Sequence, residues 1–211
     1  MLPRVYPILD TRSFDRHALD WVASAAALLE GGAAILQIRH KTPWTRETFA
    51  RSREIARLCR DAGAQLIVND RADFALLLEA GLHLGQDDLS PRDARRLLGT
   101  SPTLGYSTHN LGQLCAAAAE PVDYVALGPI FQTDSKSNPD PVVGTEQVRR
   151  ARAAIDKPLV AIGGITIENA AAVWRAGADA VAIIAGLFPE QPTPRSLRLR
   201  MEQWRQLEQA V

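Results

Sequence analysis

The sequence predicts an α/β protein, a single (β/α)8 TIM barrel spanning residues 1–211. A unit made of a short apolar strand, a polar loop and an amphipathic helix recurs along the chain, and eight such units in about 200 residues are typical of a compact parallel barrel. Several strands are nearly continuous apolar runs, as expected for buried parallel strands. Of the 211 residues, 46% are hydrophobic, and no low-complexity tract or linker divides the chain, which favours one domain.

The repeating units follow one another from end to end. The predicted strands lie at residues 4–9, 34–39, 64–69, 82–85, 103–107, 123–128, 158–163 and 180–184. The helical patterns lie near residues 17–30, 46–62, 72–80, 91–98, 110–119, 145–155, 167–176 and 195–209. Helix-start signals at Ser90-Pro91 and Thr166 agree with these bounds. An open doubly wound sheet is the alternative, but it favours a glycine-rich turn after the first strand, and "ILDTRSFD" has none.

The charge balance and the apolar runs exclude several classes of protein. The 24 basic and 24 acidic residues give a formal net charge of zero, so no overall charge attracts nucleic acid or an anionic membrane. No signal peptide is apparent, and the longest apolar runs are far shorter than the roughly 20 residues that span a bilayer. We therefore expect a cytoplasmic protein. Cys59 and Cys115 lie in helical patterns without metal-ligand spacing, and we expect both to be small buried residues.

Polar residues gather after the predicted strands, where the active site of such a barrel lies. They are Gln37, Arg39 and Lys41, then Asn69 and Asp70, then Gln86, Asp87 and Asp88, then Ser107, Thr108 and His109, then the loop 128–144, and finally Gly163, Gly164, Ala185 and Gly186. Period-two alternation puts residues 37, 39 and 41 on one side of their strand. Only three of the 24 basic residues are Lys, and two of them, Lys41 and Lys136, belong to this face. Lys157 precedes a strand and is expected at the surface of the opposite face.

These residue types suit phosphate and a divalent cation. The cations Arg39, Lys41 and Lys136, with the hydroxyls of Thr133 and Ser135, suit a phosphate-rich ligand. The carboxylates of Asp70 and Asp88 suit Mg²⁺, which commonly binds one or two carboxylates together with water and substrate phosphate oxygens. The turns at Gly163-Gly164 and after the last strand match the phosphate site of many barrels. The sequence thus predicts a diphosphate-like and a monophosphate-like anion site.

Simpler roles remain open for single residues. Asp70 could cap the helix near residue 72, Arg39 could pair with a surface acid, and Asp87 or Asp88 could be solvated loop acids. Among the histidines, His83 is expected to be structural, His40 to be a solvated neighbour, and His109 to cap a helix or line the mouth of the barrel.

Seven stretches resemble the thiamine-phosphate synthases and the related thiazole tautomerases. They are "LQIRHK", "IVNDRADFAL", "GLHLGQDDL", "GYSTHN", "DYVALGPIFQTDSK", "LVAIGGI" and "GADAVAII", in the family's order across residues 36–184. The resemblance implies that a pyrimidine diphosphate is bound by Gln37, Arg39, Lys41, Asn69, Ser107 and Lys136, with Ser107 and Lys136 catalytic. It implies that the thiazole phosphate is bound by Thr133, Ser135, Gly164, Ile184 and Ala185. It also implies Mg²⁺ as the cofactor, held by Asp70 and Asp88.

The implied reaction joins these two small phosphorylated substrates to give thiamine phosphate and diphosphate; neither nucleic acid nor a membrane is an expected partner. Four positions depart from the common pattern, namely His40, Ser135, Thr145 and Ala185. The last of these lacks the hydroxyl of a frequent Ser. One alternative is a thiazole tautomerase, whose catalytic histidine would correspond to His109. A barrel that binds thiamine precursors without converting them is the other. The sequence does not indicate an oligomeric state.

Overall fold

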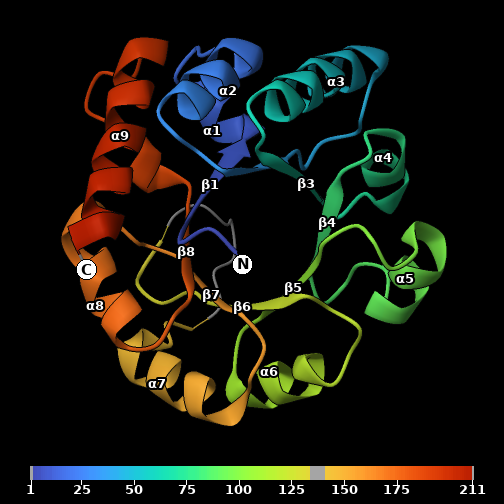
Figure 1. Cartoon of the computed structure of the whole chain (residues 1–211), viewed down its shortest axis with the longest axis vertical. Helices are drawn as coiled ribbons and strands as arrows, with labels where there is room; N and C mark the ends of the chain where they lie inside the picture. The colour runs from blue at the N-terminus through green and yellow to red at the C-terminus, as the bar shows by residue number, and fades with distance from the viewer. Residues whose placement is uncertain (1, 134–140, 211) are drawn as a thin grey trace.

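The computed structural model describes residues 2–133 and 141–210 and confirms the predicted barrel (Figure 1). Eight parallel strands form a closed sheet in sequence order, and β1 pairs with β8. The strands are β1 Val5–Asp10, β2 Ile35–Arg39, β3 Gln65–Asn69, β4 Gly81–Leu84, β5 Leu104–Thr108, β6 Tyr124–Leu127, β7 Leu159–Ile162 and β8 Ala180–Ile183. The helices are α1 Thr11–Arg16, α2 Trp21–Glu30, α3 Arg46–Asp61, α4 Ala72–Leu77, α5 Pro91–Leu98, α6 Leu111–Ala118, α7 Gly144–Ala154, α8 Ile167–Arg175, the 3-10 turn η1 Ala185–Leu187 and α9 Pro194–Ala210.

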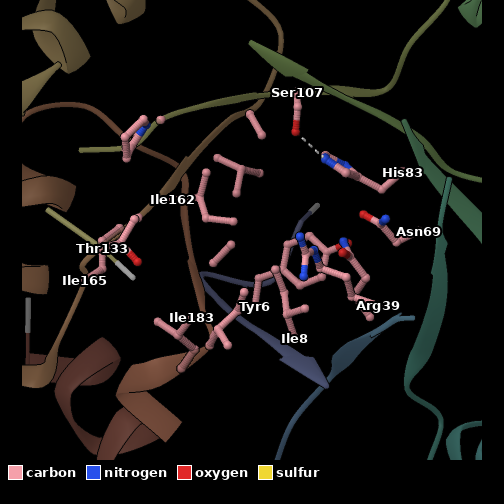
Figure 2. Close-up of a pocket in the computed structure, with 18 of the residues that line it drawn as sticks. Tyr6, Ile8, Arg39, Asn69, His83, Ser107, Thr133, Ile162, Ile165 and Ile183 are labelled. Carbon is pink, nitrogen blue, oxygen red and sulfur yellow. Dashed lines mark hydrogen bonds between the residues drawn. The ribbon is translucent and has the colours of Figure 1, made fainter. Parts of the chain in front are cut away.

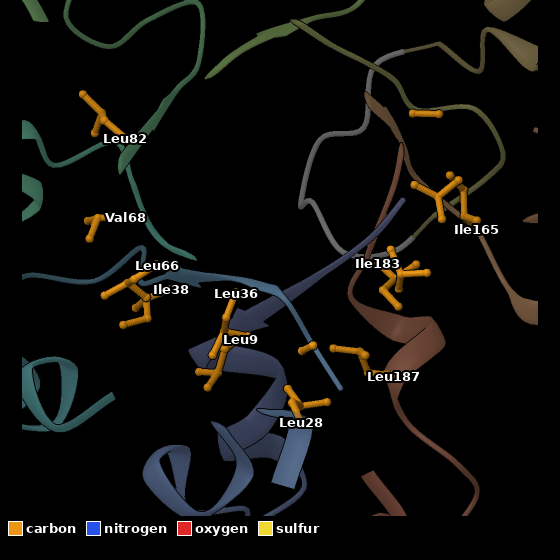
Figure 3. Close-up of a cluster of buried hydrophobic side chains, with 14 of the residues drawn as sticks. Leu9, Leu28, Leu36, Ile38, Leu66, Val68, Leu82, Ile165, Ile183 and Leu187 are labelled. Atoms are coloured by element: carbon orange, nitrogen blue, oxygen red, sulfur yellow. The ribbon is translucent and has the colours of Figure 1, made fainter. Parts of the chain in front are cut away.

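Alternation along the strands divides the apolar residues into two layers. One side of each strand faces the ring of helices, and Figure 3 shows Leu9, Leu36 and Ile38 in that layer beside Leu28 of α2. The opposite side fills the barrel interior with Tyr6, Ile8, Ile35, Ile67, Tyr124, Ala126, Val160, Ala180 and Ala182. At the C-terminal ends of the strands, the same inward-facing side carries polar residues. The alternation that fills the barrel interior therefore also points the candidate site residues inward.

The first predicted helix, residues 17–30, is wrong at its start. The structure has the short helix α1 directly after β1, and a separate α2 that begins at Trp21. Two aspartates explain the division, because Asp10 accepts the Ser13 N–H at 3.1 Å and Asp20 accepts the Ala23 N–H at 2.8 Å. Both are N-caps, and Ala18 between the two helices has a φ of 51°. The predicted helix 72–80 also ends early, at Leu77.

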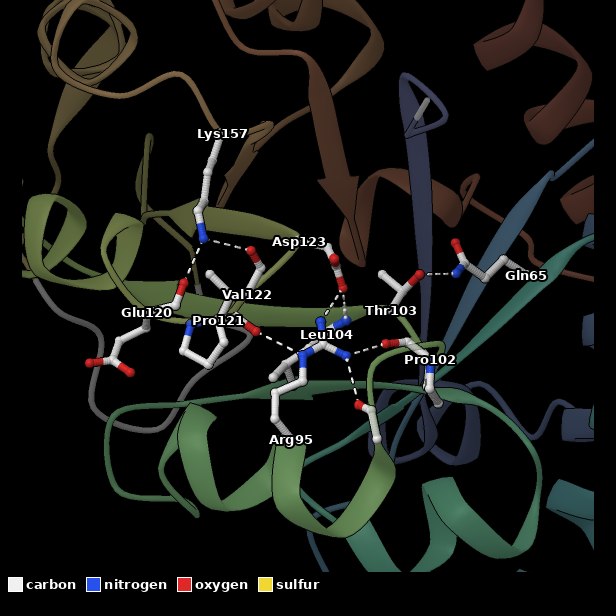
Figure 4. A network of polar contacts seen from close by, with 11 residues as sticks. Gln65, Arg95, Pro102, Thr103, Leu104, Glu120, Pro121, Val122, Asp123 and Lys157 are labelled. Atoms are coloured by element: carbon white, nitrogen blue, oxygen red, sulfur yellow. Dashed lines mark hydrogen bonds and ion pairs between the residues drawn. The ribbon is translucent and has the colours of Figure 1, made fainter.

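Polar clamps tie the chain together on the face opposite the strand ends (Figure 4). Asp123, just before β6, accepts the Leu104 N–H at 2.7 Å and the Arg95 guanidinium at 2.5 Å. The same device recurs two units later, where Asp179 accepts the Leu159 N–H at 2.7 Å and Arg152 at 2.8 Å. Each aspartate, which stands just before one strand, thus holds the first residue of the preceding strand in place.

Lys157 has a structural role on this face, more than the surface position predicted for it. Its ammonium donates to the carbonyl of Glu120 at 2.5 Å and to that of Val122 at 2.7 Å. These two carbonyls flank the turn before β6, so the lysine joins the β7 entry to the preceding loop (Figure 4).

The two cysteines differ from each other. Cys59 is buried on α3 as predicted, but Cys115 is exposed, so that prediction was wrong. On α6 the buried residues are Leu114 and Ala117, and Cys115 follows Leu114 on the solvent side of the helix. No helix within the described residues is long and apolar enough to cross a bilayer.

Candidate active site

A cavity of about 810 Å³ lies at the C-terminal ends of the strands. All of the predicted site residues that the structure describes line it: Gln37, Arg39, Lys41, Asn69, Asp70, Asp88, Ser107, Thr133, Gly164, Ile184 and Ala185. Ser135 and Lys136 lie outside the described residues. Figure 2 shows Arg39, Asn69 and Ser107 on one part of the wall and Thr133 on another. One space therefore joins the two predicted anion sites.

Two carboxylates and a lysine meet at the ends of β2, β3 and β4. Lys41 Nζ lies 2.5 Å from Asp70 Oδ2, and the carboxyl group of Asp88 lies close enough to Asp70 to affect its pKa. Asp88 accepts the N–H of Gly85 at 2.6 Å, which holds its loop in place. Burial is the main reason that the pKa of Asp70 is raised; the neighbouring Asp88 raises it further, while Lys41 opposes both. Two adjacent carboxylates whose negative charge is only partly balanced by a lysine suit the binding of a divalent cation.

Asp70 does not cap a helix, which removes its simpler role. The residue before α4 is Arg71, and no side chain caps that helix. Asp70 has a φ of 65°, in the left-handed region that residues other than Gly rarely adopt. Among the described residues no group of three or more His, Cys, Asp and Glu could form a protein-only metal cage. A pair of carboxylates is what Mg²⁺ uses when substrate phosphate oxygens and water complete its shell.

Arg39 forms an ion pair with Asp10, a residue that the sequence reading missed. Asp10 ends β1, is 3% exposed, and also accepts the Ser13 hydroxyl at 2.6 Å. Pairing with an acid was an open alternative for Arg39, but the partner is buried rather than on the surface. The guanidinium still lines the cavity with 16% of its side chain exposed. Asp10 therefore holds the guanidinium of Arg39 in position at the cavity wall.

The turn after β7 leaves room for glycine only. Gly163 and Gly164 have φ values of 103° and 64°. A Cβ on Gly163 would lie 2.6 Å from the Cα of Pro129, and one on Gly164 would lie 2.7 Å from the Cβ of Phe131. Asn169 of α8 donates to the carbonyl of Gly164 at 3.0 Å. The turn is thus fixed against the loop after β6, with its backbone facing the cavity.

A row of hydrogen bonds crosses the barrel interior along the cavity wall. Gln37 Nε2 donates to Tyr6 Oη at 2.9 Å, and Tyr6 Oη lies 2.9 Å from Tyr124 Oη. Tyr124 Oη lies 2.9 Å from His83 Nδ1, and His83 Nε2 lies 2.8 Å from Ser107 Oγ (Figure 2). Tyr6 and Tyr124 were missed, although inward alternation on the first and sixth strands was the available signal. His83, which was expected to be structural, takes part in this row and also lines the cavity.

Asn69 offers an unused donor to the cavity. The residue is 6% exposed, and its Nδ2 has no hydrogen-bond partner among the described residues. A buried amide donor without a partner costs about 1–3 kcal/mol, so an acceptor supplied by a ligand would offset that cost.

His109 and His40, the two other histidines for which the sequence predicted a role, have different surroundings. His109 lines the cavity, with Nδ1 2.8 Å from the carbonyl oxygen of Gly128. His40 is absent from the cavity wall; its ring nitrogens lie 2.9 Å from Thr11 Oγ1 and 2.8 Å from Thr42 Oγ1. His40 is half-buried rather than solvated.

Known proteins are similar to this chain over the part that forms the barrel and its cavity. A family described as thiamine monophosphate synthase matches residues 5–187. The chain belongs to the thiamine monophosphate synthase family. This match covers every strand of the barrel and η1, and all of the cavity-lining residues except Phe188 and Arg200.

Members of this family are similar to the chain over nearly its whole length. A thiamine-phosphate synthase of Koribacter versatilis is 45% identical over 203 residues, which covers 94% of this chain and 96% of that protein. A thiamine-phosphate synthase of Moorella thermoacetica is 43% identical over 186 residues, 87% of each chain. The solved structure of a thiamine phosphate pyrophosphorylase from Pyrococcus furiosus superimposes with a TM-score of 0.85 at 30% identity, covering 98% of this chain and 96% of that one.

Proposed function

We propose that the chain is a thiamine-phosphate synthase, a transferase that condenses 4-amino-2-methyl-5-(diphosphooxymethyl)pyrimidine with thiazole phosphate and releases diphosphate. The observation that carries this proposal is the shared cavity, since every described residue expected at either substrate or at the metal lines it. Membership of the thiamine monophosphate synthase family supports the same reaction.

The pyrimidine diphosphate would bind at the ends of β2 to β5. Arg39 and Lys41 supply positive charge for the diphosphate, and the unused Nδ2 of Asn69 supplies a donor beside them. Gln37 and Ser107 belong to the hydrogen-bonded row and would contact the pyrimidine. Lys136, outside the described residues, would bind the diphosphate as it leaves.

Mg²⁺ would be held by Asp70 and Asp88, whose adjacent carboxylates fit a cation that also binds diphosphate oxygens. When bound, the ion would neutralise charge that grows on the departing diphosphate. Lys41 now occupies one oxygen of Asp70 and, with 50% of its side chain exposed, can turn toward the substrate.

The thiazole phosphate would bind at the turns after β7 and β8. Gly164, Ile184 and Ala185 offer backbone to it, and Thr133 offers a hydroxyl. Ser135, which lies outside the described residues, would add a second hydroxyl. Since Ala185 has no hydroxyl, backbone groups carry more of the binding at that position.

Catalysis would rest on position and charge. The CH₂–O bond of the pyrimidine breaks with its electron pair leaving on the diphosphate, and the lone pair of the thiazole nitrogen then forms the new C–N bond. No covalent enzyme intermediate is needed. The side chains hold the two substrates in one water-poor cavity and stabilise the leaving charge.

A coupled assay tests the proposal. Purified protein is mixed with both phosphorylated substrates and Mg²⁺, and thiamine phosphate is measured. We expect product only when both substrates and the metal are present. A protein that forms no thiamine phosphate under these conditions would contradict the proposal.

A further inference from the structure

One arginine of α9 lies on the side of the helix that packs against the barrel. The buried residues of α9 are Leu197, Met201 and Trp204. Arg200 follows Leu197 by three positions and precedes Trp204 by four, so it shares their side of the helix. Arg200 is half-buried, and it lines the cavity at the strand ends. A charged group on the packed side of a helix needs a polar partner, because burying an unpaired charge is costly.

Within the described residues Arg200 forms neither an ion pair nor a hydrogen bond through its guanidinium, unlike other arginines of the same helix. Arg198 Nε lies 3.2 Å from Glu202 Oε1, and Arg205 Nη1 lies 2.6 Å from Glu208 Oε2. Both of these acids belong to α9, so the two pairs form along the helix itself. The N–H groups of Arg200 therefore remain available to a ligand in the cavity.

Two neighbours show that Arg200 lies beside the turns after β7 and β8. Trp204, one helical turn further along α9, donates from Nε1 to the carbonyl oxygen of Gly186 at 3.1 Å, which fixes the helix against η1. The pKa of Glu168, in the first turn of α8, is lowered mainly by the side chain of Thr166 and also by the charge of Arg200. The guanidinium is thus near both η1 and the start of α8, the two turns expected at the thiazole phosphate.

Positive charge on the described part of the cavity wall is unevenly distributed. Its Arg and Lys residues are Arg39, Lys41 and Arg200. The first two end or follow β2, where the pyrimidine diphosphate is expected, so among the described residues Arg200 alone brings such a charge to the turns after β7 and β8. A phosphate monoester carries about −1.5 to −2 charges at neutral pH, and the backbone groups of these turns are neutral. A cation beside them would stabilise the bound phosphate.

We propose that Arg200 binds the phosphate group of the thiazole substrate and makes the site selective for the phosphorylated thiazole over the corresponding thiazole alcohol. The inference rests on the proposed function. A guanidinium can direct two parallel N–H groups at one phosphate, and it supplies a charged donor near the position where Ala185 has no hydroxyl. The family match ends at residue 187, so Arg200 lies outside the matched residues.

Arg200→Met and Arg198→Met form a matched pair of variants, because each removes one guanidinium from α9 and keeps an unbranched apolar side chain. We expect Arg200→Met to raise the Kd for thiazole phosphate by roughly 10- to 100-fold, as for a lost hydrogen bond to a charged group. The Kd for the thiazole alcohol should not change, and Arg198→Met should affect neither ligand. Calorimetric titrations measure these values, and an unchanged Kd for the pyrimidine diphosphate shows that the cavity is intact. An unchanged Kd for thiazole phosphate in Arg200→Met, or an equal rise for both thiazoles, would overturn the inference.

Glu168→Gln tests whether Arg200 acts only by balancing the charge of that acid. Glu168→Gln alone should bind thiazole phosphate at least as tightly as the wild type, because a carboxylate near the phosphate repels it. Adding Arg200→Met to Glu168→Gln should still weaken the binding of thiazole phosphate and spare the thiazole alcohol. If the loss disappears once residue 168 is neutral, Arg200 acts through Glu168 and the inference is overturned.

The wild-type protein provides a test that needs no variant to fold. Phenylglyoxal modifies arginine side chains, and mass spectrometry identifies which of them have reacted. We expect thiazole phosphate, but not the thiazole alcohol, to slow the modification of Arg200, with Arg198 as the internal reference. Modification of Arg200 at the same rate with and without thiazole phosphate would overturn the inference, even if thiamine phosphate is formed. Protection of Arg200 in a protein that forms no thiamine phosphate would instead overturn the proposed function.

Discussion

Lys41 Nζ lies 2.5 Å from Asp70 Oδ2, and this contact joins the loops that follow two neighbouring strands, β2 and β3. The lysine only partly offsets the combined effects of burial and of Asp88, since the pKa of Asp70 remains raised. A bound divalent cation would offset the remaining negative charge of this cluster.

Removing either acid should impair the reaction far more than the fold. Asp70→Ala and Asp88→Ala should each lower kcat/KM by on the order of 10²–10³, as for the loss of one preorganised electrostatic contact. Asp73→Ala removes an acid of α4 whose exposed side chain pairs with Arg71, and it should have little effect. Steady-state assays across a range of Mg²⁺ concentrations check this. If Asp70→Ala kept nearly full activity at limiting Mg²⁺, its role at the metal would be wrong.

Substitution at the glycine turn should separate the two anion sites. Gly164→Val would press on Phe131 and force a side chain into a φ of 64°. We expect weaker binding of thiazole phosphate and little change for the pyrimidine diphosphate. Titrating each substrate alone by calorimetry decides this. Equal losses for both substrates would show that the two sites are misplaced.

The two cysteines should differ in reactivity. Burial raises the pKa of Cys59 to about 12, so almost no thiolate forms there at neutral pH, whereas Cys115 is exposed. In the native protein a thiol reagent should modify one cysteine quickly, and Cys115→Ser should abolish that fast reaction. Denaturation should reveal the second thiol. Fast modification of native Cys115→Ser would contradict the burial of Cys59.

Arg95 should contribute to stability without affecting catalysis. It donates to the carbonyls of Pro121 at 2.8 Å and Pro102 at 2.6 Å, and pairs with Asp123. Arg95→Ala should lower the free energy of unfolding by about 1–3 kcal/mol, because it leaves these acceptors without a partner. Arg96→Ala on the same helix removes a residue that is 84% exposed and should cost less than about 0.5 kcal/mol. Urea denaturation of both variants makes the comparison; similar losses would argue against the clamp.

The barrel and most of the described cavity wall were predictable because both follow from local patterns. Strand ends and period-two alternation were enough to place Gln37, Arg39 and Asn69 on the wall. Local patterns do not show which side chain of a distant strand a given residue contacts. The pairing of Arg39 with Asp10, and of His83 with Tyr124, joins strands separated by 29 and 41 positions in the sequence.

Errors at the level of single elements also have physical causes. The prediction of a helix at residues 17–30 missed α1 and began α2 four residues early, because the apolar pattern was read without the N-caps at Asp10 and Asp20, which fix where the two helices begin. Cys115 was expected inside because it lies in a helical pattern without metal-ligand spacing, which does not show which face of the helix it occupies. It directly follows the buried Leu114, and one position turns a helical side chain by about 100°.

The measurement that tests the account most directly compares Lys136→Met with His109→Asn in two assays, formation of thiamine phosphate and isomerisation of thiazole phosphate. If the chain is a synthase, Lys136→Met should lose about 2–4 kcal/mol of transition-state stabilisation, mostly in kcat, because charge on the leaving diphosphate grows in the transition state. His109→Asn should lose much less, since no imidazole has to move a proton. A wild-type protein that forms no thiamine phosphate, but isomerises thiazole phosphate until His109 is replaced, would contradict the account.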